Sequence, residues 1–162
     1  MKYIITNKQY KLLKEDEQEI LDIPSVDLFG GWDGLQEYLK RKGNPPYSIG
    51  GNLHLVGKRI ESLGNLISVG GYLNLMDTPI KSLGNLISVG GSLDLYDTPI
   101  KSLGNLISVG GLLDLEGTPI EYLGNLKSVG GYLDLTYTPI SKKITEKEIG
   151  EKVNVEGEIY LK

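Results

Sequence analysis

Three aspartates recur at a spacing of 20 residues, and their carboxylates are the groups in this sequence best placed to do chemistry. Asp94, Asp114 and Asp134 each stand between two leucines, and His54 and Asn74 hold the same place in the two preceding repeats. A row of carboxylates can bind a basic protein segment, bridge a cation through its oxygens or, with a suitable partner group, support acid–base catalysis. Which of these applies depends on the elements that position the row.

The spacing of the aspartates comes from a repeat that runs through most of the chain. The segment SLGNLISVGG occurs at 62–71, 82–91 and 102–111, and YLGNLKSVGG follows at 122–131. A fixed period of this length is typical of a solenoid, in which each repeat forms one coil and buries its apolar side against the next coil. The aspartates should therefore lie at the same place on successive coils.

Each repeat contains the pattern x-L-x-L-x, whose alternation predicts a half-buried strand. With Leu73 and Leu75 pointing inward, the strands of successive coils would form one parallel sheet, with equivalent side chains about 4.8 Å apart. Thr-Pro would turn the chain after the strand, and a Gly-Gly pair such as 70–71 would allow a positive φ or a close approach of two coils. The corner threonines, Thr78, Thr98, Thr118 and Thr138, would form a column of hydroxyls that can satisfy backbone groups of the corner.

The outward positions of these strands differ from repeat to repeat, whereas the rest of the coil is nearly constant. A surface tailored to a ligand would show this pattern, and so would neutral drift at exposed positions. We expect binding to use the outward face. The candidate binding residues are Tyr72, Asn74, Met76, Asp94, Tyr96, Asp114, Glu116, Tyr132 and Asp134.

The aspartate row admits several interpretations. Our hypothesis is a protein partner with a basic segment, contacted by the carboxylates and the neighbouring tyrosines. A second interpretation is that the aspartates are simply solvated and bind nothing, because repulsion between such carboxylates in water is only on the order of 1 kcal/mol per pair. A cation such as Ca²⁺ or a carbohydrate is a further alternative, but the loop of a dedicated calcium site is missing. We therefore predict no metal and no cofactor.

Catalysis is disfavoured by the scarcity of catalytic side chains. The chain has one histidine, His54, and no cysteine, and its arginines Arg41 and Arg59 lie outside the aspartate row. The glycine-rich GNLISVGG lacks the Lys-Ser/Thr of a phosphate-binding loop and precedes a strand. We predict no catalytic residues and a protein that is not an enzyme.

The composition narrows the partners and the compartment. The 17 lysines and arginines are scattered along the chain, and with 21 acidic residues the net charge is −4, so we expect no nucleic-acid partner. No apolar run suits a signal peptide or a membrane span, and the lack of cysteine suits a reducing compartment. These features predict a soluble, cytoplasmic protein without a membrane partner.

The repeat resembles the leucine-rich repeat over residues 50–140. Its pattern G-x-x-L-x-L-x-x-T-x-I-x-x-L is similar to that family's L-x-x-L-x-L-x-x-N-x-L, with threonine in place of the corner asparagine and glycine in place of the first leucine. The length is nearest to the short repeats of bacterial effector proteins, and YIITNKQYKLL followed by SVGGYLDL-type repeats resembles small phage-encoded proteins. The resemblance implies an α/β solenoid, mainly β, in the host cytoplasm if phage-encoded, with no defined activity.

A solenoid needs its ends covered, and the flanking segments fit this role. We expect one structural domain with a helical N-terminal cap at 1–47, the solenoid at 48–140 and a C-terminal cap at 141–162. In the first cap, Thr6-x-x-Gln9 predicts a helix to about Ile20, Asp33-x-x-Gln36 predicts a second, and Trp32 should plug the open end.

The C-terminal segment combines a helix with a return to the strand pattern. Thr145-x-x-Glu148 predicts a helix start, and Val155 and Ile159 align with Val129 and Leu133, which makes a sixth strand. Caps at both ends argue against end-to-end growth, so we expect a monomer. A structural or self-assembling role, as a virion or scaffold component, remains the alternative.

Overall fold

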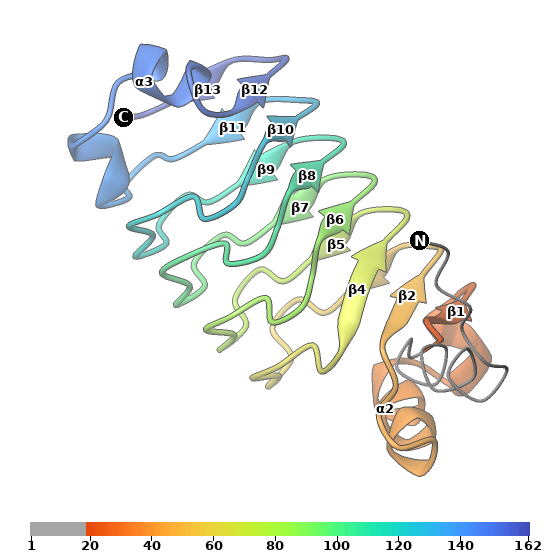
Figure 1. Ribbon diagram of the computed structural model, residues 1–162. Helices are drawn as coiled ribbons and strands as arrows, with labels where there is room; N and C mark the ends of the chain where they lie inside the picture. The colour runs from red at the N-terminus through yellow and green to blue at the C-terminus, as the bar shows by residue number, and fades with distance from the viewer. Residues whose placement is uncertain (1–18) are drawn as a thin grey trace, which may run out of the picture.

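The computed structural model describes residues 19–162, and in it each 20-residue repeat forms one coil of a parallel-strand solenoid (Figure 1). One wall is a six-stranded sheet with the order β13-β11-β9-β7-β5-β3. Its strands are β3 (Leu53–His54), β5 (Leu73–Asn74), β7 (Leu93–Asp94), β9 (Leu113–Asp114), β11 (Leu133–Asp134) and β13 (Ile159–Tyr160). The mainly β solenoid that the repeat predicts is confirmed.

The x-L-x-L-x strands do form one parallel sheet, as predicted. The opposite wall is a second parallel sheet, of seven strands, which the sequence did not predict. Its strands are β1 (Leu21–Ile23), β2 (Tyr47–Ile49), β4 (Leu66–Val69), β6 (Ser88–Val89), β8 (Ser108–Val109), β10 (Ser128–Val129) and β12 (Asn154–Val155). Ser88 lies opposite Ser68 on one side and Ser108 on the other. The three-residue spacing of Leu83, Leu86 and Val89 concealed this strand, because only the last two residues before Gly-Gly are extended and paired.

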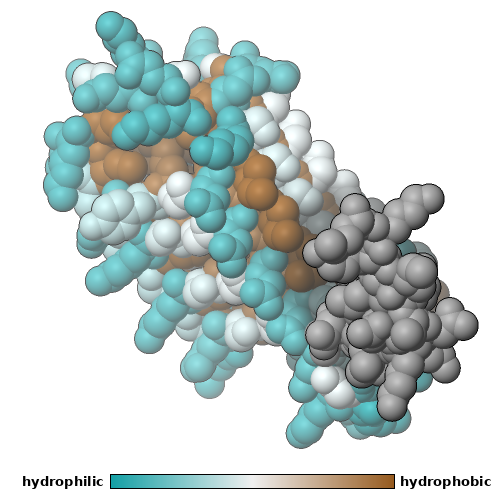
Figure 2. Space-filling view, in the orientation of Figure 1, coloured by the Kyte–Doolittle hydropathy of each residue, from teal (hydrophilic) through white to brown (hydrophobic). Residues whose placement is uncertain are grey.

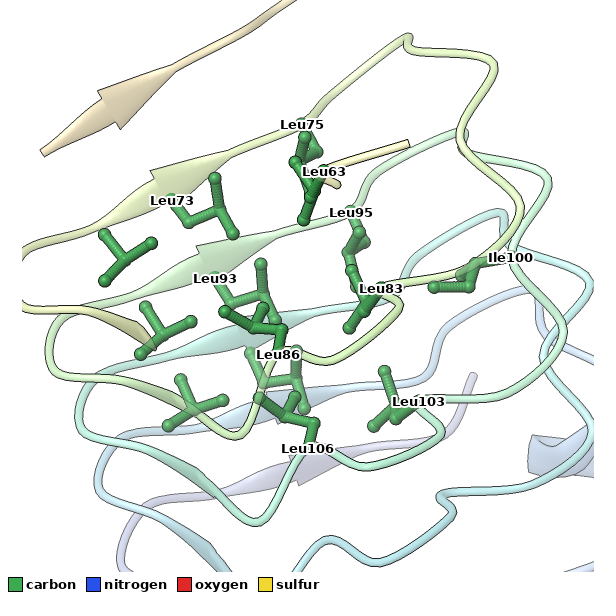
Figure 3. Packing of buried hydrophobic residues seen from close by; sticks show 14 of the residues in the cluster. Leu63, Leu73, Leu75, Leu83, Leu86, Leu93, Leu95, Ile100, Leu103 and Leu106 are labelled. Atoms are coloured by element: carbon green, nitrogen blue, oxygen red, sulfur yellow. The ribbon is translucent and has the colours of Figure 1, made fainter. Parts of the chain in front are cut away.

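The core lies between the two sheets and consists of the same side chains in each coil. In the coil that starts at residue 70, the inward-pointing apolar side chains are at most 2% exposed; they are Leu73, Leu75, Ile80, Leu83, Leu86 and Val89. Leucines of successive coils stack on one another (Figure 3). At the corner, buried Thr98 donates a hydrogen bond from Oγ1 to the Leu95 carbonyl oxygen at 2.7 Å, and its equivalents do the same. The predicted threonine column therefore does satisfy the corner.

The Gly-Gly corners bring the backbones of neighbouring coils into close contact. A Cβ atom on Gly90 would collide with the carbonyl oxygen of Gly70, and the same holds along this column. Neither glycine has a positive φ. The left-handed positions of each coil are instead the glycine of its GNL segment, such as Gly84 with φ of 60°, and the residue before the corner threonine, such as Asp97 with φ of 51°. Close approach is thus the reason for glycine at the Gly-Gly corner.

The N-terminal end is covered by a 3₁₀ helix, η1 (Val26–Phe29), and by α2 (Trp32–Arg41). Trp32 is 6% exposed and belongs to the core, as does Leu35. The second predicted helix is confirmed, but its predicted start at Asp33 is wrong, because α2 begins at Trp32 with Gly31 as its N-cap and no side-chain cap hydrogen bond. The Gln36 side chain instead donates to the Tyr47 hydroxyl at 3.3 Å. The helix predicted from Thr6 lies outside the described residues, except for its last two positions.

At the other end, a 3₁₀ helix η2 (Ile140–Lys142) and α3 (Glu146–Gly150) are inserted before the last strands. The capping box at Thr145 is confirmed, with both reciprocal hydrogen bonds to Glu148. The predicted alignment of the sixth strand is also confirmed, since Ile159 lies opposite Leu133. Among residues 19–162, no helix combines the length and apolar character needed to cross a membrane.

Candidate functional site

The aspartates form an unbroken row on the outer side of the six-stranded sheet, which we call the strand face. Asp114 lies opposite Asp94 on β7 and opposite Asp134 on β11, and the row continues to Asn74 at one end and Tyr160 at the other. These aspartates are half-buried, whereas the leucines on either side of each are fully buried. The remaining candidate residues lie at the flanking outward positions of the same strands, at Tyr72, Met76, Tyr96, Glu116 and Tyr132.

Each aspartate of the row also closes the turn that follows its strand. Its Oδ1 accepts a hydrogen bond from the backbone N–H two residues later, at 3.0 Å from Tyr96 to Asp94 and at 2.9 Å from Glu116 to Asp114. Asn74 closes the equivalent turn through its amide oxygen. This local role was not predicted, although the exchange of asparagine and aspartate at one position was its signal in the sequence. The hydrogen bond holds each carboxylate in place and leaves its second oxygen available.

The negative charges on the strand face are concentrated around Asp114. Carboxylate oxygens of Asp114, Glu116 and Asp134 lie within 4.8 Å of one another. Burial raises the pKa of Asp114, and the charges of Asp94, Asp134 and Glu116 raise it further, against the lowering effect of the backbone hydrogen bond. Each of these residues brings one carboxylate oxygen to the group, which is fewer than the six to eight oxygens that Ca²⁺ takes, so the cluster alone does not make a calcium site.

The carboxylates of this face form no ion pair in the described part of the chain. Within residues 19–162, the one ion pair joins Arg41 to Glu37 on α2. The outward positions of the six-stranded sheet carry a lysine or arginine only at Lys162. The negative charges also act on a tyrosine of this face: the charge of Asp97, followed in size of effect by that of Glu116, raises the pKa of Tyr96.

Aromatic rings on the strand face form two edge-to-face pairs. The rings of Tyr132 and Tyr160 lie 5.6 Å apart between centroids, with an interplanar angle of 82°. The rings of His54 and Tyr72 lie 4.3 Å apart at 74°. Tyr160 and His54 were not among the predicted binding residues, because only the fold shows that each packs diagonally against a tyrosine of the neighbouring coil.

Two further surfaces were not predicted. On the seven-stranded sheet, Ile87 and Ile107 are 40% and 44% exposed, and an apolar stripe runs along this side of the molecule (Figure 2).

A groove of about 900 Å³ lies between α3 and residues 121–127, with Leu123 and Ile149 among its lining residues. The segment YLGNLKSVGG at 122–131 differs from the other three copies at Tyr122 and Lys127, and both residues line this groove. This difference was the signal of the groove in the sequence.

No protein-family model, curated protein or solved structure matches this chain.

Proposed function

We propose that this protein is a non-catalytic binding module whose strand face holds a basic segment of a partner protein. The observation that carries the proposal is the in-register row of Asp94, Asp114 and Asp134, none of which forms an ion pair with a basic side chain of residues 19–162. Like charges opposite one another on neighbouring strands are destabilising, and a cationic partner would remove that repulsion. The turn hydrogen bonds support the proposal, because prepositioned side chains lose little entropy when they bind.

The tyrosines beside the carboxylates supply the second part of the binding surface. Tyr72, Tyr96 and Tyr132 flank the row, and Tyr132 is 40% exposed. Tyrosine offers a large apolar ring and a polar hydroxyl with few rotatable bonds, which is why it is enriched at interfaces. Met76 adds an adaptable apolar contact at the same outward level as Tyr96. The proposed interaction needs no metal, cofactor, nucleic acid or membrane.

We also propose that the coils are of the leucine-rich-repeat-like kind. The x-L-x-L-x strand and the buried corner side chain support this assignment. The similarity to small phage-encoded repeat proteins and to short-repeat bacterial effectors belongs to the same proposal. It would place the protein in the cytoplasm of a bacterial host cell.

The test compares the wild type with a triple variant, Asp94→Asn, Asp114→Asn and Asp134→Asn. Asparagine keeps the oxygen that closes each turn, so the variant loses charge without losing the hydrogen bond. The matched control, Glu61→Gln, Glu121→Gln and Glu151→Gln, removes as many charges outside the strand face. Partners captured from a lysate of the source cell are identified and then titrated against each purified protein.

We expect at least a tenfold loss of affinity in the triple asparagine variant and little change in the control. The affinity of the wild type should fall as the salt concentration rises, because the contact is electrostatic. Equal affinity of the wild type and the asparagine variant for every captured partner would contradict the proposal.

Self-assembly is a second candidate function, and the exposed Ile87 and Ile107 on the seven-stranded sheet favour it. In an assembly, these side chains would pack against a second copy. The test is the mass in solution, measured by light scattering for the wild type and for Ile87→Lys with Ile107→Lys. A wild-type mass of several protomers that falls to one in the variant would support assembly, and a monomeric wild type would exclude it.

A further inference from the structure

The two aromatic pairs stand at opposite ends of the aspartate row, and we infer that they mark the ends of the partner's footprint. His54 and Tyr72 belong to the first and second coils, whereas Tyr132 and Tyr160 belong to the fifth and to the strand that follows it. The order along the sheet is His54, Asn74, Asp94, Asp114, Asp134 and Tyr160. The strand face is thus acidic in its middle and aromatic at both ends.

The rings are available for contact. Tyr132 and Tyr160 are 40% and 41% exposed, His54 is exposed and Tyr72 is half-buried. An edge-to-face pair satisfies the edge of one ring and the face of the other, and it leaves further ring surface open. The open face of a tyrosine attracts a lysine or arginine, and its body packs against aliphatic side chains.

The dimensions of the face determine how a partner can lie on it. Across the strands, from His54 to Tyr160, there are five coil-to-coil steps of about 4.8 Å, or about 24 Å in all. Along a strand, the outward positions of one coil, such as 92, 94 and 96, span only about 13 Å. An extended chain that rises about 3.3 Å per residue covers the longer dimension with about seven residues.

The partner that fits this surface is therefore an extended basic segment of about seven residues, lying along the solenoid axis across all six strands. Its central lysine or arginine side chains lie over the aspartate row, and its end residues rest on the two aromatic pairs. Charge complementarity selects this occupant, because the middle of the face carries Asp94, Asp114, Glu116 and Asp134 and no basic side chain. The inference rests on the proposed function and adds the direction and length of the bound segment.

The experiment uses oligo-arginine peptides of two lengths, four and eight residues, with an octaglutamate as the charge control. Binding is measured by isothermal titration calorimetry to the full chain as wild type, Tyr72→Ala, Tyr132→Ala and the triple asparagine variant. Tyr122→Ala serves as the matched control, because Tyr122 is 66% exposed and lies outside the strand face. Circular dichroism checks that each variant is folded.

We expect the octapeptide to bind at least tenfold more tightly than the tetrapeptide. Tyr72→Ala and Tyr132→Ala should each weaken octapeptide binding by three- to tenfold, and Tyr122→Ala should not. If the triple asparagine variant loses binding but neither of these two tyrosine substitutions weakens it, the footprint is wrong and the proposed function stands. If the wild type does not bind the octapeptide, or the triple variant binds it equally well, both proposals fail.

Discussion

Asp114 accepts a hydrogen bond from the backbone N–H of Glu116 at 2.9 Å, and this contact closes the turn after β9. The turn needs an acceptor at this position but no charge, because Asn74 makes the equivalent bond to Met76 at 3.0 Å. Three aspartates in a row therefore add repulsion that the fold itself does not require. A charge without a structural role in the turn supports the proposed binding of a cationic partner.

Because the turn accepts either asparagine or aspartate, replacing one by the other at positions 114 and 74 should change stability at neutral pH only through the charge. Asp114→Asn keeps the turn and removes repulsion from Asp94 and Asp134, so the free energy of unfolding should rise by about 0.5 kcal/mol. Asn74→Asp adds a charge opposite Asp94 and should lower it by a similar amount. Urea denaturation measures both, and equal stability of all three proteins would contradict the argument.

The gain from Asp114→Asn should also depend on pH. Burial raises the pKa of Asp114 above its ordinary value of 3.8, so the folded protein holds this proton more tightly than the unfolded chain does. The wild type therefore loses stability as the pH rises through the raised pKa, and the variant lacks this loss. Their difference should be large at pH 7 and shrink below pH 4. A difference that grows in acid would have the wrong sign.

The Gly-Gly corner predicts a strongly destabilising substitution. Gly90→Ala places a Cβ against the Gly70 carbonyl oxygen, and separating the coils should cost about 2 kcal/mol or more. Gly150→Ala is the matched control, since Gly150 ends α3 and a Cβ there meets no atom within 4 Å. The control should be neutral or slightly stabilising. Thermal unfolding of both variants checks the prediction, which fails if they unfold at the same temperature.

Tyr137 is held in the left-handed region, with φ of 58°, although its side chain is 77% exposed. The equivalent positions carry glycine or aspartate. Tyr137→Asn should therefore stabilise the fold by about 0.5 to 1 kcal/mol. Gly57→Ala should have the opposite effect, because Gly57 has φ of 63° and a Cβ there would contact nothing. Chemical denaturation measures whether the free energy of unfolding rises in Tyr137→Asn and falls in Gly57→Ala. A loss of stability in Tyr137→Asn would show that the backbone at this position is not strained.

Tyr47 joins the N-terminal cap to the first coil. Its buried hydroxyl donates to the Leu63 carbonyl oxygen at 2.7 Å, and burial raises its pKa to about 12. The unfolded chain ionises near 10, so the wild type should lose stability as the pH rises from 10 towards 12. Tyr47→Phe should lose about 1 kcal/mol at pH 7 and lack this alkaline loss. An unchanged alkaline profile in the variant would show that another group controls it.

The period of the sequence was sufficient to predict the solenoid and the inward leucines, because both are repeated at a fixed spacing. The register of β13 was predictable because the strand pattern resumes after the inserted helix. The second sheet was missed because a strand as short as Ser88–Val89 has too few residues to show alternation. The helix start was misassigned to Asp33 because a motif of two residues cannot show that Gly31 is already the N-cap of a helix that begins at Trp32. The turn-closing role of the aspartates and the aromatic pairs depend on contacts between atoms, which no spacing reveals.

The central claim is that partners bind the strand face, and site-specific photo-crosslinking in the source cell tests it most directly. The photoreactive p-benzoylphenylalanine is placed singly at Tyr96 on the strand face, at Ile107 on the seven-stranded sheet and at Tyr122 beside the α3 groove. We expect an adduct from position 96, with the crosslink in a segment rich in lysine or arginine, and none from the other two. Adducts from position 107 or 122 with none from position 96 would contradict the account.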